Sequence, residues 1–449
     1  MPRMPIIQEG STYREITQNF YGYDHKEKIA DGEFYDTQNL TTAYYPLFAV
    51  RKKRGFVKDL YAPGGLIDKV NLAYVDDGEL FLNDRPVMGG LTVGEKQLVG
   101  FGAYICIFPD KKYYNTAEPS DYGDMADDLS LIPDMDYVIE CKNRLWGCKY
   151  GVVDGQNINE IYACELGNFG NWTVYEGIST DPYTASVGSD GPWTGAINYM
   201  GYPTFFKEDR IHRVAVSAIG AHEITETVCD GIQKGSAKSA AVLNGLLYYK
   251  SNSNVCIYQG GTAPTSISDQ LGDLHYSDAC AGIIGDSYYI SMKDNDGKWS
   301  LFVYDTKRGL WMREDNLHVT SFAAVGEELY ALDADKHLWA LKGSTGDPED
   351  HVLWYGESGV MYYQYPDKKY VSRFNIRLNM EKGSRARVSL MYDSSGRWER
   401  MGELISDRLR TITLPIKPRR CDHLRIRIEG IGDVKIYSIA RVLELGSDY

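Results

Sequence analysis

The stretch Asn244–Gly343 contains one short phrase three times. Asn244-Gly-Leu-Leu-Tyr-Tyr-Lys250 opens the first copy, Gly285-Asp-Ser-Tyr-Tyr-Ile-Ser291 the second, and Gly326-Glu-Glu-Leu-Tyr-Ala-Leu332 the third. Each opening is followed by a polar turn and a second strand-like run. The three opening glycines are 40 and 41 residues apart.

This spacing is typical of β-propeller blades, which repeat about every 40–50 residues as short alternating strands. One copy is too small to bury its own apolar face, whereas a ring of copies buries both faces of each unit against its neighbours. Similar openings occur near residues 72, 102, 143 and 203. Together they give seven candidates, and because the first is short we predict a propeller of six or seven blades over residues 55–343.

The pattern changes after residue 343. Residues 344–350, Ser-Thr-Gly-Asp-Pro-Glu-Asp, have the composition of a linker. Beyond them apolar and charged residues alternate with period two, which predicts strands with one buried and one charged face. We therefore expect an all-β chain in which residues 351–449 form a C-terminal β-sandwich, jelly-roll-like in form. The alternating runs are Val371–Met380, Arg385–Tyr392, His423–Glu429 and Val434–Ile439.

Residues 1–54 do not follow either pattern, and we predict an extended N-terminal arm. Its apolar side chains should not stay in water, so the arm is expected to lie either on the chain's own propeller or on a neighbouring subunit. The basic run Arg51–Arg54 is interpreted as a solvated turn, with phosphate contact as the alternative. The apolar and aromatic residues of the arm are Phe20, Tyr21, Tyr23, Phe34, Tyr35, Tyr44, Tyr45, Leu47 and Phe48.

Composition restricts the function. A net charge of −14 argues against tight sequence-independent binding of nucleic acid, although DNA can slide past an acidic wall. No apolar run reaches about 18 residues, so we predict no membrane insertion, and the first residues lack the pattern of a secretory signal. The eight cysteines stand singly, which predicts buried free thiols in a reducing cytoplasm rather than zinc or disulfides.

No chemical motif points to an enzyme. The sequence has no His-Glu-x-x-His, no Gly-x-Ser-x-Gly and no phosphate loop. Asp294-Asn-Asp-Gly297 is interpreted as a hairpin tip and residues 115–136 as an exposed acidic loop, rather than as calcium sites. We therefore predict no catalytic, cofactor-binding or metal-binding residues. We also assign three tryptophans to the blade core: Trp146, Trp311 and Trp339.

Seven short phrases of the sequence match the text of a known family of proteins. They lie in residues 32–40, 46–51, 143–147, 161–172, 255–268, 383–398 and 415–420. These phrases resemble tailed-bacteriophage virion proteins, the β-propeller proteins of tail nozzles, tail hubs and stabilising collars. The resemblance implies a structural protein that forms a homo-oligomeric, sixfold ring at the phage tail, contacts exiting DNA during ejection, and binds other tail proteins such as an adaptor or a tail fibre. It also implies a location in the virion after assembly in the bacterial host cytoplasm.

Two other functions stay open at this point. A receptor-binding or carbohydrate-binding tail protein would present exposed aromatic side chains on loops, although the same residues could equally pack inside blades or interfaces. A glycan-degrading propeller enzyme would need a pair of carboxylates, which sequence alone cannot select from 62 acidic residues. The aromatic candidates are Tyr113, Tyr114, Trp172 and Trp193.

Overall fold

The computed structural model of the chain describes residues 12–153, 155–215, 222–261, 263–362, 369–417 and 419–445. The first eleven residues of the predicted arm and the last four of the predicted sandwich lie outside these ranges. The described residues form 40 β-strands and three single-turn 3-10 helices, with no α-helix among them, so the prediction of an all-β chain is confirmed. No helix in the described ranges has the length and apolar character needed to cross a membrane.

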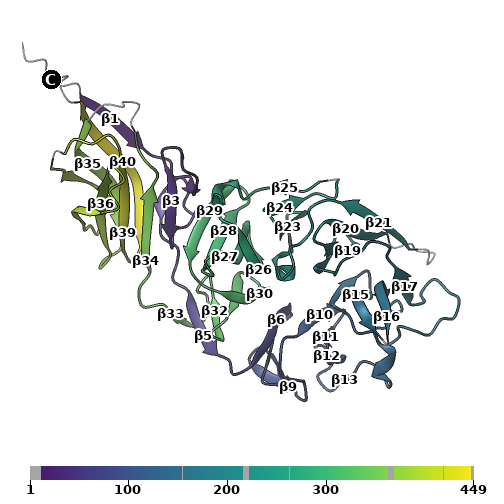
Figure 1. The fold of residues 1–449 in the computed structure, drawn as a ribbon. Helices are drawn as coiled ribbons and strands as arrows, with labels where there is room; N and C mark the ends of the chain where they lie inside the picture. Colours follow the sequence, from purple (N-terminus) through teal and green to yellow (C-terminus); the bar gives the residue numbers. More distant parts are fainter. Residues whose placement is uncertain are drawn as a thin grey trace, which may run out of the picture.

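Residues 55–348 form seven successive antiparallel sheets, sheets 1–7, in a propeller-like arrangement (Figure 1). Sheet 1 contains β6 (Pro63–Lys69), β7 (Asn71–Asp76), β8 (Glu79–Leu82) and β9 (Arg85–Met88); sheet 2 contains β10 (Gln97–Phe101), β11 (Tyr104–Phe108), β12 (Lys112–Asn115) and β13 (Tyr122–Asp124). Sheet 3 contains β14 (Tyr137–Cys141), β15 (Arg144–Val153), β16 (Gln156–Ala163) and β17 (Tyr183–Ser186); sheet 4 contains β18 (Gly195–Tyr199), β19 (Tyr202–Lys207), β20 (Arg210–Ala215) and β21 (Glu223–Val228).

The remaining three sheets complete the ring. Sheet 5 contains β22 (Ala241–Leu243), β23 (Leu246–Lys250), β24 (Val255–Tyr258) and β25 (Thr265–Ser266); sheet 6 contains β26 (Tyr276–Ile284), β27 (Ser287–Asp294), β28 (Trp299–Asp305) and β29 (Leu310–Asp315). Sheet 7 contains β30 (Val319–Val325), β31 (Glu328–Asp333), β32 (His337–Ala340), β5 (Gly55–Asp59) and β33 (Asp347–Pro348). The 3-10 turns are η1 (Leu129–Leu131), η2 (Ala237–Ser239) and η3 (Asp269–Leu271).

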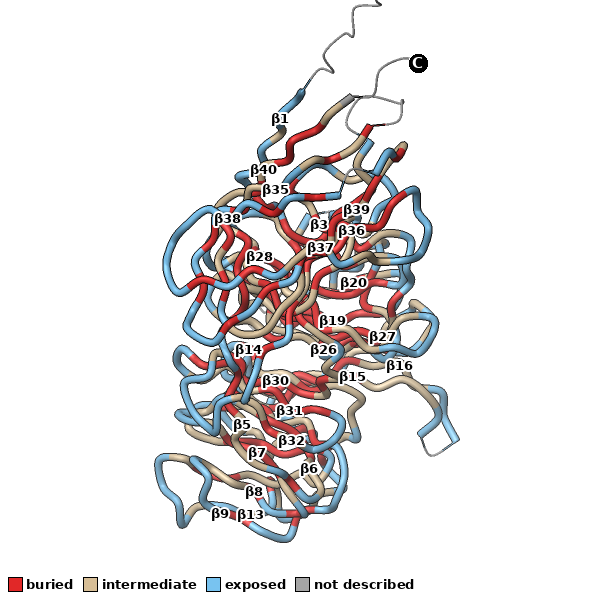
Figure 2. The backbone as a smooth tube through the Cα atoms, turned by 90° about the vertical axis from the view of Figure 1, so that its left-hand side faces the viewer, coloured by how far each residue is buried: buried red, intermediate tan, exposed pale blue. Residues whose placement is uncertain are grey.

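Apolar clusters between consecutive sheets close the ring. Each consecutive pair of sheets shares one buried cluster, and the same holds for sheet 7 and sheet 1, where Leu332 and Leu338 pack with Leu66 and Tyr74. Strand β30 lies beside β6 at that junction. Figure 2 shows the buried residues concentrated along the strands, with the connecting loops exposed. Each sheet therefore buries both faces, as the repeat requires.

The turn after the first strand of each sheet explains the sequence period. Asn244 and Gly245 both have positive φ, 53° and 77°, as in the two-residue turns that match the twist of a hairpin. All seven openings identified in the sequence coincide with such a turn, one per sheet. The positive-φ residues at these turns are Val70, Gly102, Asn143, Gly201, Gly245, Gly285 and Gly326.

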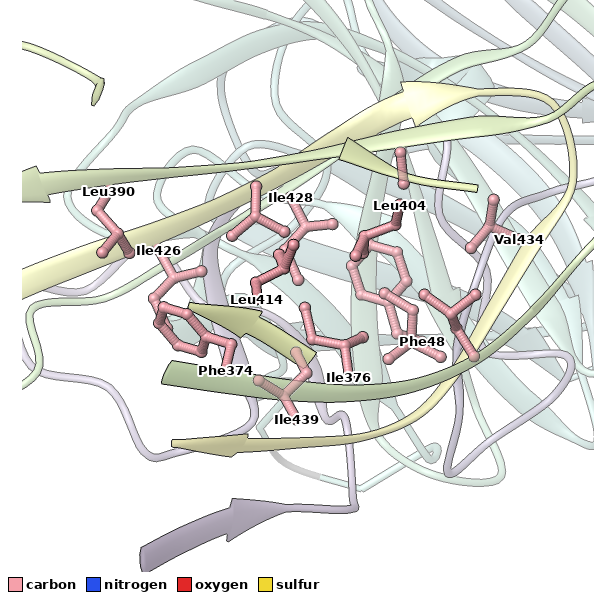
Figure 3. Close-up of a cluster of buried hydrophobic side chains, with 14 of the residues drawn as sticks. Phe48, Phe374, Ile376, Leu390, Leu404, Leu414, Ile426, Ile428, Val434 and Ile439 are labelled. Carbon is pink, nitrogen blue, oxygen red and sulfur yellow. The ribbon is translucent and has the colours of Figure 1, made fainter. Parts of the chain in front are cut away.

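The C-terminal unit is built from two sheets that share one apolar cluster (Figure 3). Phe374 and Ile376 from one sheet meet Ile426 and Ile428 from the other, all essentially inaccessible to solvent. One sheet contains β1 (Thr12–Thr17), β40 (Val434–Leu445), β35 (Lys369–Met380) and β38 (Arg410–Pro415), with β4 (Phe48–Ala49) beside β40. The other contains β2 (Gly22–Tyr23), β3 (Glu33–Gln38), β34 (Leu353–Ser358), β39 (Leu424–Ile431), β36 (Arg385–Tyr392) and β37 (Glu399–Leu404).

The predicted N-terminal arm is wrong for residues 12–49. These residues form four strands of the C-terminal unit, and Phe20, Phe34 and Phe48 enter its core. The cause is long-range pairing: β1 pairs with β40 from Thr12↔Glu444 to Thr17↔Ile439, which no local pattern reveals. The described part of the segment therefore packs on its own chain. The predicted linker is also structured, because β33 pairs with β5 in sheet 7.

A buried ion-pair network, the Arg51–Arg54 network, joins the ring to the C-terminal unit. The Arg54 guanidinium lies 2.6 Å from the carboxylates of both Glu314 and Asp315, at the end of β29. Arg51 lies 2.7 Å from Glu349, which also accepts a hydrogen bond from the Arg54 backbone N–H. Both arginine side chains are almost completely buried. The interpretation of Arg51–Arg54 as a solvated turn is therefore wrong for the two arginines, and neither is free to contact phosphate.

The network keeps the carboxylates of Asp315 and Glu349 ionised. Burial alone would raise the pKa of Asp315, but Arg54 and Arg51 outweigh burial and hold that pKa below its usual range. Burial would also raise the pKa of Glu349, but the hydrogen bonds and charges of Arg51 and Arg54 together outweigh burial and lower that pKa. Since charged groups of both signs are buried together, removal of one partner leaves the others uncompensated.

We expect Arg54→Met to lower the free energy of unfolding by about 3–5 kcal/mol, because it leaves Glu314 and Asp315 buried without their closest cation. Urea denaturation followed by tryptophan fluorescence measures the change. Lys52→Met, at an exposed position of the same run, is the matched control and should stay within about 0.5 kcal/mol of the parent chain. Equal stability of the two variants would contradict a structural role for the network.

Two of the three tryptophans assigned to the core are confirmed. Trp146 and Trp311 are 0% and 1% exposed, whereas Trp339 is half-buried beside Phe56. We expect Trp311→Ala to cost about 3–5 kcal/mol of unfolding free energy, and Trp339→Ala to cost clearly less because its ring keeps water contact. Thermal and denaturant unfolding of both variants measures the two losses of stability. A larger loss in Trp339→Ala than in Trp311→Ala would refute the assignment of Trp311 to the core.

Candidate functional site

A cavity of about 840 Å³ lies among the inner strands of the ring, and we call it the interior cavity. Its walls come mainly from the first strands of sheets 2, 3, 4, 6 and 7 and from the segments that precede β10, β14 and β22. Concave sites of this size among several elements are common places for ligands. The interior cavity is therefore the first candidate for a catalytic or ligand-binding site.

The charges at the interior cavity are paired with each other. The Lys238 ammonium lies 2.7 Å from the Glu95 carboxylate and donates to the Thr320 carbonyl oxygen at 3.0 Å, so it connects the segments entering sheets 5 and 2 with sheet 7. These side chains bridge the interior of the ring. Four further lysines at or beside the cavity have the same kind of partner: Lys96–Asp110, Lys111–Asp134, Lys149–Asp136 and Lys293–Asp278.

One stacked pair contributes the aromatic surface of the interior cavity. The rings of Trp299 and His318 lie parallel, with centroids 3.4 Å apart. Burial lowers the pKa of His318, so this imidazole is neutral at physiological pH. With every nearby lysine held by a carboxylate and the imidazole covered on one face, the cavity presents a neutral polar wall rather than a catalytic group poised to act.

A serine, a histidine and a glutamate meet between sheets 3 and 4. The Ser189 hydroxyl lies 2.9 Å from His212 Nε2, and the Glu226 carboxylate lies 3.2 Å from the same nitrogen. A nucleophile triad needs the acid on the opposite ring nitrogen, where it fixes the tautomer. His212 Nδ1 is instead buried without a hydrogen-bond partner. The cluster therefore does not have the geometry of a catalytic triad.

Trp193 packs in this region instead of forming an exposed platform. The Lys207 ammonium lies 4.6 Å above the Trp193 ring and donates to the Ser189 carbonyl oxygen at 2.5 Å. The ring itself is 4% exposed. A cation already occupies its face, so the surface that a sugar would use is taken.

The aromatic residues selected as exposed binding candidates are mostly core residues. Tyr114, Trp172 and Trp193 are buried, so of the two alternatives packing inside the blades is the correct one for them. Tyr113 is partly exposed and lines a surface groove. Trp172 follows a glycine- and asparagine-rich turn, which looks like loop sequence, but its indole N–H donates to the Phe169 carbonyl oxygen at 2.8 Å and its ring joins the cluster between sheets 2 and 3.

The acidic stretch 115–136 is only partly a loop. It contains β13, the outer strand of sheet 2, and several of its carboxylates have fixed partners. Asp124 lies 2.6 Å from Lys112, and Asp134 lies 2.7 Å from Lys111. These ion pairs were not predicted from the sequence. Their lysines belong to the preceding strand and turn, and the number of residues between such a lysine and the acidic stretch does not indicate which Asp it contacts.

Two local predictions agree with the structure. Asp294 closes a hairpin tip, where its carboxylate accepts from the backbone N–H groups of Asp296 and Lys298 at 2.9 Å. All eight cysteines are free thiols, and all except Cys229 are buried. Burial raises the pKa of Cys141 to about 11 and that of Cys164 to about 12, so these thiols are unreactive at neutral pH.

Comparison with known proteins identifies neither a family nor an activity for the chain. No protein-family model matches the chain, and no curated protein matches it. Among solved structures, a Trypanosoma rangeli sialidase is 10% identical over 88% of this chain and 95% of its own, with a TM-score of 0.30. Kluyveromyces lactis Hsv2 is 11% identical over 60% and 94%, with a TM-score of 0.35. A putative gluconolactonase is 12% identical over 62% and 97%, with a TM-score of 0.34. These likenesses assign no activity to the chain.

The environment of His212 predicts a loss of stability in acid. Burial lowers its pKa to about 4, although Glu226 opposes the shift. The folded chain then binds fewer protons at this site than the unfolded chain, whose histidines titrate near pH 6.5. The stabilising effect is complete above about pH 6.5 and is lost as the pH falls toward 4, by about 3 kcal/mol in all.

The corresponding measurement is the free energy of unfolding between pH 7 and pH 4. His212→Gln should flatten this dependence by about 3 kcal/mol relative to the parent chain. His351→Gln, at an exposed histidine, is the control and should keep the parent pH dependence. A His212→Gln variant with an unchanged slope would show that the imidazole is not held neutral.

Proposed function

We propose that sheets 1–7 form a seven-bladed β-propeller and that the C-terminal unit is a β-sandwich, jelly-roll-like in form. The seven consecutive sheets, the shared apolar clusters and the junction between β30 and β6 support the propeller. Its last blade combines β30–β32 with β5 from the N-terminal side, so the two ends of the ring are held by hydrogen bonds. Two sheets over one apolar core support the sandwich.

We further propose that the protein is a structural component of a tailed-phage virion, where copies of it form a ring at the tail nozzle or hub. The observation on which the proposal rests is the open edge of the C-terminal unit. Strand β1 ends its sheet and, among the described residues, pairs with β40 alone. Its Ile16 side chain is 56% exposed. An open edge strand with an apolar side chain is a template for pairing with another chain.

The rigidity of the chain supports the same role. The Arg51–Arg54 network ties the ring to the C-terminal unit at the end of β29, and Thr37 of β3 donates a hydrogen bond to the Arg313 carbonyl oxygen of that strand. An edge on a rigid body repeats at a fixed angle from copy to copy, which is the condition for a closed ring. Sixfold symmetry, an adaptor or tail-fibre partner, and assembly in the host cytoplasm follow from the sequence resemblance alone.

The DNA passage in this proposal lies between copies. Within one chain the Lys238, Glu95 and Thr320 contacts bridge the interior of the propeller. The channel is therefore the central opening of the oligomer. A net charge of −14 suits a wall that repels phosphate and lets DNA pass without binding.

The proposal predicts rings of the purified full chain. We expect negative-stain electron microscopy and analytical ultracentrifugation to show closed rings, and Ile16→Lys to reduce their population because a lysine on an edge strand opposes pairing. Val70→Lys, at an exposed turn position of sheet 1, is the matched control and should assemble normally. Both variants should keep the parent melting temperature.

Two results would contradict the proposal. One is a full chain that remains monomeric at high concentration and in the presence of tail proteins. The other is reproducible depolymerisation of capsular or cell-wall polysaccharide by the pure chain, abolished when one Asp or Glu is changed. The second result would instead support the glycan-degrading alternative.

A further inference from the structure

A groove of about 800 Å³ lies at the outer rim of sheets 2 and 3, and we call it the rim groove. One wall is the segment from Asp121 to Leu131, which contains β13. The other wall is the segment from Asn168 to Val174, which follows β16. The rim groove is separate from the interior cavity, with which it shares no lining residue.

Three aromatic rings form the base of the rim groove. Tyr104, Tyr113 and Phe169 pack against each other with centroids 5.1–5.6 Å apart. None of the three is fully buried, so each leaves part of its ring at the groove. Near the mouth, Leu131 and Val174 expose about half of their surface. Apolar surface of this kind collected around one concavity marks a binding site.

Polar side chains beside the rings are held in fixed orientations. The Asp121 carboxylate accepts from the Tyr113 hydroxyl and from the Asn115 amide, both at 2.9 Å. The Asn171 side-chain oxygen accepts from the Thr173 and Val174 backbone N–H groups, at 3.3 and 2.9 Å, which uses both of its lone pairs. Each oxygen of the Asp121 carboxylate has two lone pairs, so Asp121 keeps capacity for a further hydrogen bond. The groove thus presents oriented acceptors next to aromatic rings.

The charge of the rim groove selects among ligands. Asp121, Asp124 and Asp127 line it, so an anionic ligand is repelled. Lys112 already pairs with Asp124 at 2.6 Å, and the Tyr113 hydroxyl and the Asn115 amide hold the Asp121 carboxylate in place. Only Asp127 has neither an ion pair nor a side-chain hydrogen bond among these described carboxylates. Aromatic rings with carboxylate oxygens beside them fit an uncharged ligand whose hydroxyl groups donate hydrogen bonds.

We propose that the rim groove binds a neutral saccharide. The C–H face of a sugar ring lies against Tyr104 and Tyr113, which combine apolar faces with polar tips. Its hydroxyl groups donate to the carboxylates of Asp121 and Asp127, which both line the groove. Sites that hydrogen-bond a ligand hydroxyl discriminate strongly against analogues that lack it. This proposal stands independently of ring formation, since the groove belongs to a single chain.

The test uses the full chain and defined probes. Saturation-transfer NMR and isothermal titration calorimetry are carried out with maltotriose, cellotriose and triacetylchitotriose, and with 3′-sialyllactose as the anionic comparator. We expect saturable binding of at least one neutral probe and none of the anionic one. Tyr113→Ala should weaken the neutral probe about three- to tenfold, the equivalent of one aromatic contact.

Two further variants keep the test decisive. Tyr113→Phe retains the ring but removes its hydrogen bond to Asp121, so it should fold normally and weaken binding less than Tyr113→Ala. Tyr61→Ala removes an exposed tyrosine outside the groove and should bind like the parent chain. Three results overturn the proposal: no neutral probe binds at millimolar concentration; affinity is unchanged in Tyr113→Ala; or an oligolysine peptide binds in place of the saccharides and is lost with Asp127→Asn, which would assign the groove to a protein partner.

Discussion

The buried contact of Arg51 and Arg54 with Glu314, Asp315 and Glu349 is the interaction on which the architecture depends. It brings together three parts of the chain that are distant in sequence: the N-terminal segment, the last strand of sheet 6 and the segment that leads into the C-terminal unit. Because ions buried in protein are tolerated only when all partners are present, the three parts must be in place together. The orientation of the C-terminal unit on the ring is therefore fixed by electrostatics as well as by apolar packing.

The same rule governs the interior of the ring but not its rim. Around the interior cavity each lysine has a carboxylate partner, as in the contact of Lys238 with Glu95, and the charges serve to hold neighbouring sheets in place. At the rim groove, partly exposed rings lie beside oriented acceptors, and Asp127 has no partner among the described residues. The cavity that is larger and central is thus internally satisfied, whereas the shallower groove keeps unused binding capacity.

The sequence predicted those features that depend on residues close together in the chain. The hairpin turns at Gly245, Gly285 and Gly326 depend on residues a few positions apart, so their spacing revealed the repeated sheets and their number within one. Burial of single cysteines inside apolar runs was predictable for the same reason. The partners of β1 and β4 lie about 400 residues away, and no single sequence specifies such pairs. The sequence left Trp172 and Trp193 open between exposure and packing, because turn-like flanks conceal a ring that is covered by a neighbouring sheet.

The placement of β5 has a consequence for synthesis on the ribosome. This strand is made among the first sixty residues, but its partner β32 begins only at His337. Strand β1 must wait longer still, until β40 near the end of the chain has emerged. Sheets 1–6 can form as they leave the ribosome, while both early strands remain without their partners. A chain that ends before His337 would therefore hold sheets 1–6 beside two early strands, β1 and β5, that still lack their partners.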